Sequence, residues 1–137
     1  MHFAYRPKDN YLISASIKDL DKLAALWKSR ISFKQEELLF LKNLIENEIA
    51  KPGGSKHYER LSEICPVVER KMSEVKTLLG RIDMHSVHIE ELLEGIFQSD
   101  ENIFRKSNSD LEDKVSRFIV KCDELKREIF SIYSLSK

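Results

Sequence analysis

A row of branched aliphatic residues, spaced seven apart, runs through the middle of this 137-residue chain. A slightly underwound α-helix repeats its side-chain direction every seven residues, so such a row forms one apolar stripe along a long helix. No polar residue interrupts the row, and a stripe of that length must be covered by other helices. The row consists of Leu61, Val68, Val75, Ile82, Ile89, Ile96 and Ile103.

Capping patterns and breaks predict one helix before this stripe and one after it. Ser16 and Asp19 have the spacing of a capping box, which places the start of the first helix at Ser16. Ser109 and Glu112 repeat that spacing and place the start of the third helix at Ser109. The first helix must end at a run that contains a proline and two glycines, namely Lys51, Pro52, Gly53 and Gly54.

The central helix is predicted to cover residues 55–105, with Ser55 as its cap. Pro66 removes one backbone hydrogen bond and should kink this helix near Ser62. Gly80 weakens it, but the apolar row keeps the same phase before and after Gly80, which favours one continuous helix. The alternative is a break between Gly80 and Ser86, which would give four shorter helices.

The predicted fold class is therefore all-α, with long antiparallel helices. We expect a three-helix, coiled-coil-like rod with a kinked central helix, or a four-helix bundle if the central helix breaks near Gly80. In the rod, the first and third helices overlap only beside the middle of the central helix. Residues 15–137 form a single helical domain, and residues 1–14 form an N-terminal tail that docks in part.

Charge and motifs argue against several functional classes. The chain has 23 basic and 23 acidic residues, whereas nucleic-acid and membrane-surface proteins need a basic excess. Phosphate-binding glycine loops, nucleophile elbows and zinc-protease motifs are missing, so we expect no enzyme activity and no cofactor. No apolar run is long enough to span a bilayer, and two scattered cysteines favour a cytoplasmic protein.

Two histidines are the main candidates for metal chemistry. His85 and His88 are neighbours on a helix, and Glu91 extends their row by one turn, so the three could hold a metal ion. However, His85 flanks the apolar stripe and His88 points away from it, and no Glu-x-x-His pair occurs in the chain. We therefore interpret both as solvated surface histidines and keep a metal-binding helical bundle as the alternative function.

Three other residues that interrupt or join the apolar rows have structural interpretations. Cys65 and Cys122 occupy buried rows, have no neighbouring histidine and are expected to be inert thiols that lie apart. Lys34 interrupts the row of the first helix and is expected to form an ion pair with the region of Glu69 to Glu74.

The first helix carries a wider apolar face than a two-helix rod can bury. The surplus residues need a further partner, and exposed apolar patches of that extent usually mark an interface. The sequence thus predicts a non-enzymatic structural or protein–protein interaction module that self-associates into a homodimer or higher oligomer and recruits another protein, without nucleic acid or membrane. The predicted interface residues are Leu23, Phe33, Phe40 and Leu44.

Overall fold

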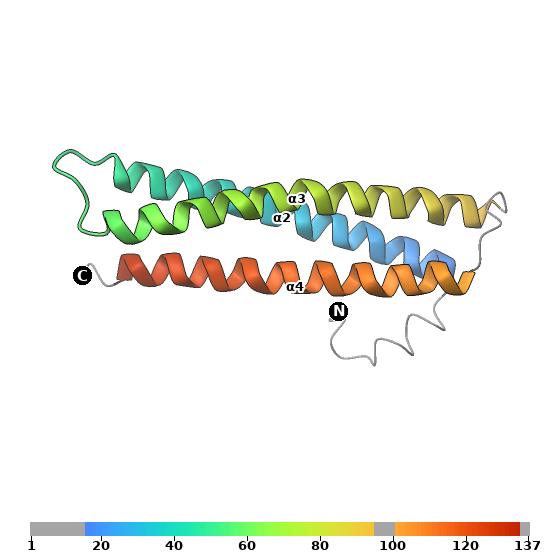
Figure 1. Cartoon of the computed structure of the whole chain (residues 1–137). Helices are drawn as coiled ribbons and strands as arrows, with labels where there is room; N and C mark the ends of the chain where they lie inside the picture. The colour runs from blue at the N-terminus through green and yellow to red at the C-terminus, as the bar shows by residue number, and fades with distance from the viewer. Residues whose placement is uncertain (1–15, 95–100, 135–137) are drawn as a thin grey trace.

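The structure is a computed structural model that describes residues 16–94 and 101–134. These residues form three long helices, α2 (Ile17–Ile49), α3 (Tyr58–Leu93) and α4 (Glu101–Ser134), with no strand among them (Figure 1). The predicted all-α fold class is therefore confirmed. The predicted N-terminal tail, residues 1–14, lies outside the described residues.

The start and the end of α2 follow the predicted signals. Ser16 is extended, and its side-chain oxygen accepts a hydrogen bond from the backbone N–H of Asp19 at 3.1 Å. The helix ends at Ile49, and Gly53 and Gly54 both adopt a φ of 84° in the turn that follows. Glycine takes this left-handed conformation without steric cost, so the turn is encoded locally.

Ser55 belongs to this turn and not to the start of α3. Its hydroxyl donates to Glu48 Oε2 at 2.9 Å and accepts from the backbone N–H of His57 at 3.1 Å. Because the side chain is bonded back toward the end of α2, it stabilises the reversal, and α3 begins only at Tyr58. The predicted cap at Ser55 is wrong for this reason.

The central helix continues through both of its weak points. Pro66 and Gly80 lie inside α3, which is unbroken from Tyr58 to Leu93. The four-helix alternative, with a break near Gly80, is therefore wrong. A glycine within a helix costs only about 1 kcal/mol, which the burial of one face of α3 offsets. The kink expected at Pro66 stays a prediction.

The chain reverses between α3 and α4 earlier than the apolar row predicted. Instead of one helix that reaches Arg105, α3 ends at Leu93 and α4 begins at Glu101. Ile103, the last member of the row, is 68% exposed, and its neighbour Phe104 is buried in its place. An early reversal lets α4 cover the other two helices along most of their length, and this burial outweighs the local pattern.

The capping pattern that was expected to start the third helix lies inside α4. Residues 107–112 are helical throughout, and Asn108 and Glu112 are buried. Asparagine favours turns because its side chain can bond to nearby backbone, but here Asn108 has a partner across the core. The predicted start at Ser109 is therefore wrong.

The helices α2 and α4 run parallel to each other and antiparallel to α3 (Figure 1). Three hydrogen bonds between α2 and α4 each join residues that are 89 positions apart, from Lys34 and Asp123 to Leu44 and Tyr133. A constant offset means a parallel pair in fixed register. The expectation that these helices overlap only beside the middle of the central helix is wrong.

One core runs along the axis between the three helices. The row Leu61, Val68, Val75, Ile82 and Ile89 forms the α3 side of this core, and every member is 0% exposed. From α2 the core receives Leu20, Trp27, Ile31, Leu38 and Ile45, and from α4 it receives Leu111, Val115, Phe118, Leu125, Ile129 and Ile132.

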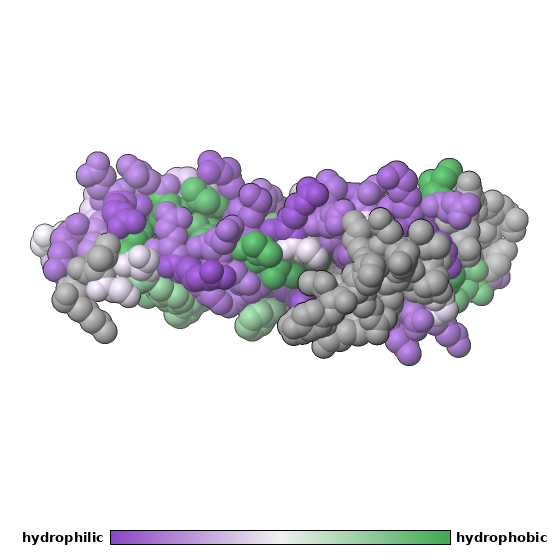
Figure 2. All heavy atoms as spheres, turned by 90° about the horizontal axis from the view of Figure 1, so that it is seen from below, coloured by the Kyte–Doolittle hydropathy of each residue, from purple (hydrophilic) through white to green (hydrophobic). Residues whose placement is uncertain are grey.

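The described residues on the face of the molecule seen in Figure 2 are mostly hydrophilic. Figure 2, which looks onto α4 from below, shows hydrophilic side chains interrupted by separate hydrophobic patches. Among the described residues, no helix has the length and apolar character that a membrane span requires.

Candidate functional site

A chain of ion pairs joins α2 to α4. Lys34 Nζ lies 2.9 Å from Glu37 Oε1 and 2.7 Å from Asp123 Oδ1, and Lys126 Nζ lies 2.9 Å from Glu37 Oε2. Lys34 thus binds carboxylates on α2 and α4, not the predicted α3 region of Glu69 to Glu74. The reason is that α4 covers this side of α2, which the sequence-based arrangement left open.

The charged side chains of these ion pairs stabilise one another. Burial alone would lower the pKa of Lys34, but the carboxylates of Asp123 and Glu37 outweigh it and raise that pKa above its usual value. Burial would raise the pKa of Glu37, but hydrogen bonds from Lys34 and Lys126 outweigh it and lower that pKa. The side chains of Lys34 and Glu37 are therefore both charged at neutral pH, and charge-assisted hydrogen bonds hold these ion pairs together.

A shallow hollow lies toward each end of this ion-pair chain, and each is edged by an exposed phenylalanine. Phe33 is 57% exposed and Phe40 is 59% exposed. The first hollow is lined by Ser29, Arg30, Phe33, Lys34 and Ile119. The second is lined by Glu36, Glu37, Phe40, Leu41, Lys126 and Phe130. We call the surface made by the two hollows and the ion pairs between them the α2–α4 face.

The four predicted interface residues fall into two groups. Phe33 and Phe40 are exposed on the α2–α4 face. Leu23 is only 2% exposed and belongs to the core, and Leu44 is half-buried beside Tyr133, whose hydroxyl donates to the Leu44 carbonyl at 3.1 Å. The surplus apolar face of α2 is thus covered in part by α4, and its exposed remainder centres on the two phenylalanines.

Two further members of this face come from α4 and were missed by the sequence analysis. Ile119 lines the hollow of Phe33, and Phe130 lines the hollow of Phe40. Both lie outside the buried rows of α4, which is a visible signal in the sequence. Their position beside α2 depends on the early reversal between Leu93 and Glu101, which the apolar row concealed.

A second cluster, which we call the polar layer, interrupts the core near the start of α4. His85 is 5% exposed, and its Nε2 lies 2.6 Å from Asn108 Oδ1. The imidazole stacks on Phe104 at a centroid distance of 4.8 Å with an interplanar angle of 2°, and the Trp27 ring lies 6.3 Å away. The interpretation of His85 as a solvated surface histidine is therefore wrong, because the early reversal brings α4 over it.

The polar layer holds a neutral histidine and two unbonded donors. Burial lowers the pKa of His85 and is only partly countered by the hydrogen bond to Asn108, so the ring is neutral at neutral pH. With Nε2–H donating to Asn108 Oδ1, neither Asn108 Nδ2 nor Trp27 Nε1 has a hydrogen-bond partner among the residues that the structure describes. Such a layer restricts the register of the helices, since a shifted α4 would leave more polar atoms unbonded.

The three candidate metal ligands do not come together in a metal site among the described residues. His85 binds Asn108 in the core, and His88 and Glu91 are half-buried one and two turns further along α3. Among residues 16–94 and 101–134, no group of three or more histidine, cysteine or carboxylate side chains could hold a metal ion. The metal-binding alternative stays a prediction without an assembled site in this part of the chain.

The two cysteines are free thiols in separate places. Cys65 is half-buried on α3, and Cys122 is buried on α4. Burial raises the pKa of Cys122 to about 11, against the smaller opposing effect of Lys71 and Lys34, and burial also raises the pKa of Cys65. Both thiols are therefore protonated at neutral pH, as the interpretation of inert structural thiols requires.

In comparisons with known proteins, no family model, no curated protein and no solved structure matches this chain significantly. The α2–α4 face and the polar layer therefore have to be interpreted from their own geometry.

Proposed function

We propose that this chain is a non-enzymatic protein–protein interaction module that self-associates through its α2–α4 face. The observation that carries the proposal is the pair of phenylalanines, Phe33 and Phe40, that are more than half exposed beside hollows on the same face. Burial of a phenylalanine side chain contributes about 1.5–3 kcal/mol, so four such rings in a dimer provide a substantial driving force.

The face is suited to an antiparallel pair related by a two-fold axis. Phe33 and Phe40 are seven residues apart on α2, which is about 10 Å along the helix. A two-fold axis near Glu36 would place Phe33 of one copy against the Phe40 hollow of the second copy, and the reverse. A symmetric contact of this kind closes on itself and forms a dimer, not a filament.

Charge does not select the orientation of the pair. Lys34 and Glu37 already form an ion pair within each copy, and an axis near Glu36 brings the two copies of Glu36 together. The antiparallel arrangement is therefore proposed from the spacing of Phe33 and Phe40 and from their hollows.

The proposal is tested by the mass in solution of the unchanged protein and of Phe33→Glu and Phe40→Glu variants, measured by light scattering during size exclusion. We expect a dimer for the unchanged protein and a monomer for each variant, with unchanged helical circular dichroism. The matched control is Met84→Glu, because Met84 is 67% exposed on α3, outside the proposed face. A monomeric unchanged protein would refute self-association, and a dimer that survives both substitutions would place the interface elsewhere.

The orientation is tested by a single added cysteine. Glu36 is exposed and lies near the proposed two-fold axis. Under mild oxidation, the cysteine of a Glu36→Cys variant should therefore form a disulfide with the same residue of the second copy. Ser29→Cys is the control, because in an antiparallel pair residue 29 of one copy lies far from residue 29 of the other. Efficient cross-linking of the Ser29→Cys variant, without that of Glu36→Cys, would contradict the antiparallel arrangement.

A further inference from the structure

A second surface, formed by α3 and α4, concentrates positive charge although the whole chain has a net charge of zero. An open groove of about 380 Å³ lies between α3 and α4. We call it the basic groove, because five cationic side chains and a single carboxylate, Glu74, line it. The cations are Lys71 and Arg81 of α3 and Lys114, Arg117 and Lys121 of α4.

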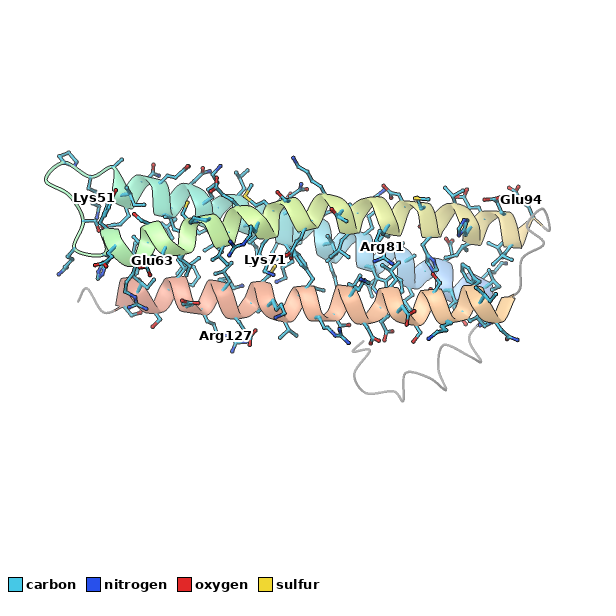
Figure 3. All side chains as sticks on the ribbon, viewed as in Figure 1. Lys51, Glu63, Lys71, Arg81, Glu94 and Arg127 are labelled. Carbon is cyan, nitrogen blue, oxygen red and sulfur yellow. The ribbon has the colours of Figure 1, made fainter. Side chains whose placement is uncertain are left out.

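The cations of the basic groove form two facing rows. Lys114, Arg117 and Lys121 recur every three or four residues on α4, so they share one side of that helix. Lys71 and Arg81 project from α3 into the space toward α4 (Figure 3). A linear ligand in the groove would therefore have positive charge on both sides.

Most of this charge is not neutralised by other described residues. Lys71 forms an ion pair with Glu74 at 3.1 Å, and its Nζ lies 5.8 Å from the ring centroid of Phe118 in the groove floor. Among the described residues, Arg81, Lys114, Arg117 and Lys121 make no ion pair. Five clustered cations repel one another, and an anionic partner would relieve that repulsion.

We propose that the basic groove binds an acidic helical segment of a partner protein. The cations stand at the edges of the groove, above a floor of Leu78 and Phe118 that is at most 8% exposed, so the groove matches a helix chiefly through carboxylates on both of its sides. From Lys71 to Arg81 the groove extends about 15 Å along α3, which is the length of about three helical turns. This inference concerns a surface separate from the proposed dimer face.

Two other polyanions fit the groove less well. Single-stranded nucleic acid is bound through exposed aromatic rings on which bases stack, but Phe118 is only 5% exposed. A membrane surface is flat and attracts convex basic patches with exposed apolar anchors, whereas these cations surround a hollow between two helices. Both polyanions nevertheless belong in the test.

The test measures binding of a fluorescent synthetic peptide to the full chain by anisotropy. The peptide is an amphipathic helix of about 18 residues with glutamates spaced three and four apart around a leucine stripe. The control peptide has every glutamate replaced by glutamine. We expect the acidic peptide to bind at least about tenfold more tightly than the control at 50 mM salt, and the difference to shrink at 300 mM salt, because screening weakens exposed charge pairs.

Two matched double variants distinguish binding at the groove from a general effect of net charge on binding. Arg117→Glu with Lys121→Glu should weaken peptide binding by about tenfold or more, because these two exposed cations line the groove. Lys22→Glu with Lys76→Glu makes the same change in net charge at exposed positions outside it and should leave binding unchanged. Circular dichroism establishes that all three variant chains fold alike, including Phe33→Glu, which should retain peptide binding while losing self-association.

Three results would overturn the inference. Equal binding of the acidic and glutamine peptides would exclude charge recognition, and equal loss in the two double variants would exclude the groove as the site. Tighter binding of a single-stranded oligonucleotide or of vesicles rich in phosphatidylserine than of the acidic peptide would assign the groove to another class of ligand.

Discussion

His85 of α3 and Asn108 of α4 form a hydrogen bond of 2.6 Å in the core of the protein, where both side chains are at most 5% exposed. This bond joins the two helices on either side of the second reversal. It also places an ionisable ring where only its neutral form is favoured.

Acidification should destabilise the protein through His85. The unfolded chain binds a proton at this ring with the ordinary pKa of 6.5, whereas burial lowers the pKa in the folded chain. Below about pH 6.5 the unfolded state therefore binds more protons than the folded state. As the pH is lowered further, the free energy of unfolding decreases until the pH reaches the pKa of His85 in the folded chain. Urea titrations between about pH 7.5 and 5 should show this loss.

The control for this pH effect is the double substitution His85→Leu with Asn108→Leu. It removes the titrating ring and its partner together, so no buried polar atom of this pair remains unbonded. We expect a flatter dependence of stability on pH over the same range. An unchanged slope would assign the pH effect to other groups.

Lys34 should stabilise the contact between α2 and α4. Lys34→Met removes one end of two ion pairs and leaves Asp123 without this partner, so we expect a loss of about 1–2 kcal/mol in the free energy of unfolding. A double-mutant cycle with Asp123→Asn isolates the interhelical pair. A coupling energy near zero would show that the ion pair between Lys34 and Asp123 does not contribute to the free energy of unfolding. Lys28→Met is a matched control, because Lys28 and its partner Asp83 are both more than half exposed.

Cys122 should resist alkylation in the folded protein. Its pKa of about 11 leaves about one thiol in a thousand ionised at pH 8, and the side chain is buried. Mass spectrometry after treatment with iodoacetamide should find Cys65 modified first, because Cys65 is only half-buried, and both modified in denaturant. Rapid native modification of Cys122 would mean that α4 opens locally.

Gly80→Ala should stabilise α3 by about 1 kcal/mol, because alanine favours helix over glycine by that amount. Outside the backbone of its own helix, a methyl group built at Gly80 meets no atom of the described residues within 4 Å, so the substitution introduces no clash with them. Thermal unfolding followed by circular dichroism would measure the gain. A loss of stability would mean that residue 80 contacts something outside the described residues.

The features that follow from local chemistry were predictable from the sequence. The cap at Ser16, the glycine turn and the buried row from Leu61 to Ile89 each depend on a few neighbouring residues and a fixed helical period. Phe33 and Phe40 were also identifiable as surplus apolar residues on α2. Each of these predictions needs no knowledge of where the other helices lie.

The features that depend on the second reversal were not predictable in the same way. Ile96 and Ile103 continue the heptad spacing and suggest a longer central helix, although Ile103 is exposed in the structure. The misplaced reversal shifted α4 along its neighbours, and this single error hid the partners of His85 and Lys34. A short apolar period cannot distinguish one helix from two that happen to share a phase.

Because α2 and α4 run parallel to each other, the dipoles of the three helices do not cancel. Each helix has a dipole equivalent to about half a charge at each end, and α3 cancels only one of the two dipoles that point the same way. The amino ends of α2 and α4 emerge together at one tip, so that tip carries the positive end of the uncancelled dipole. In an antiparallel pair of copies the helix dipoles would cancel, whereas in a single copy one of them remains uncancelled.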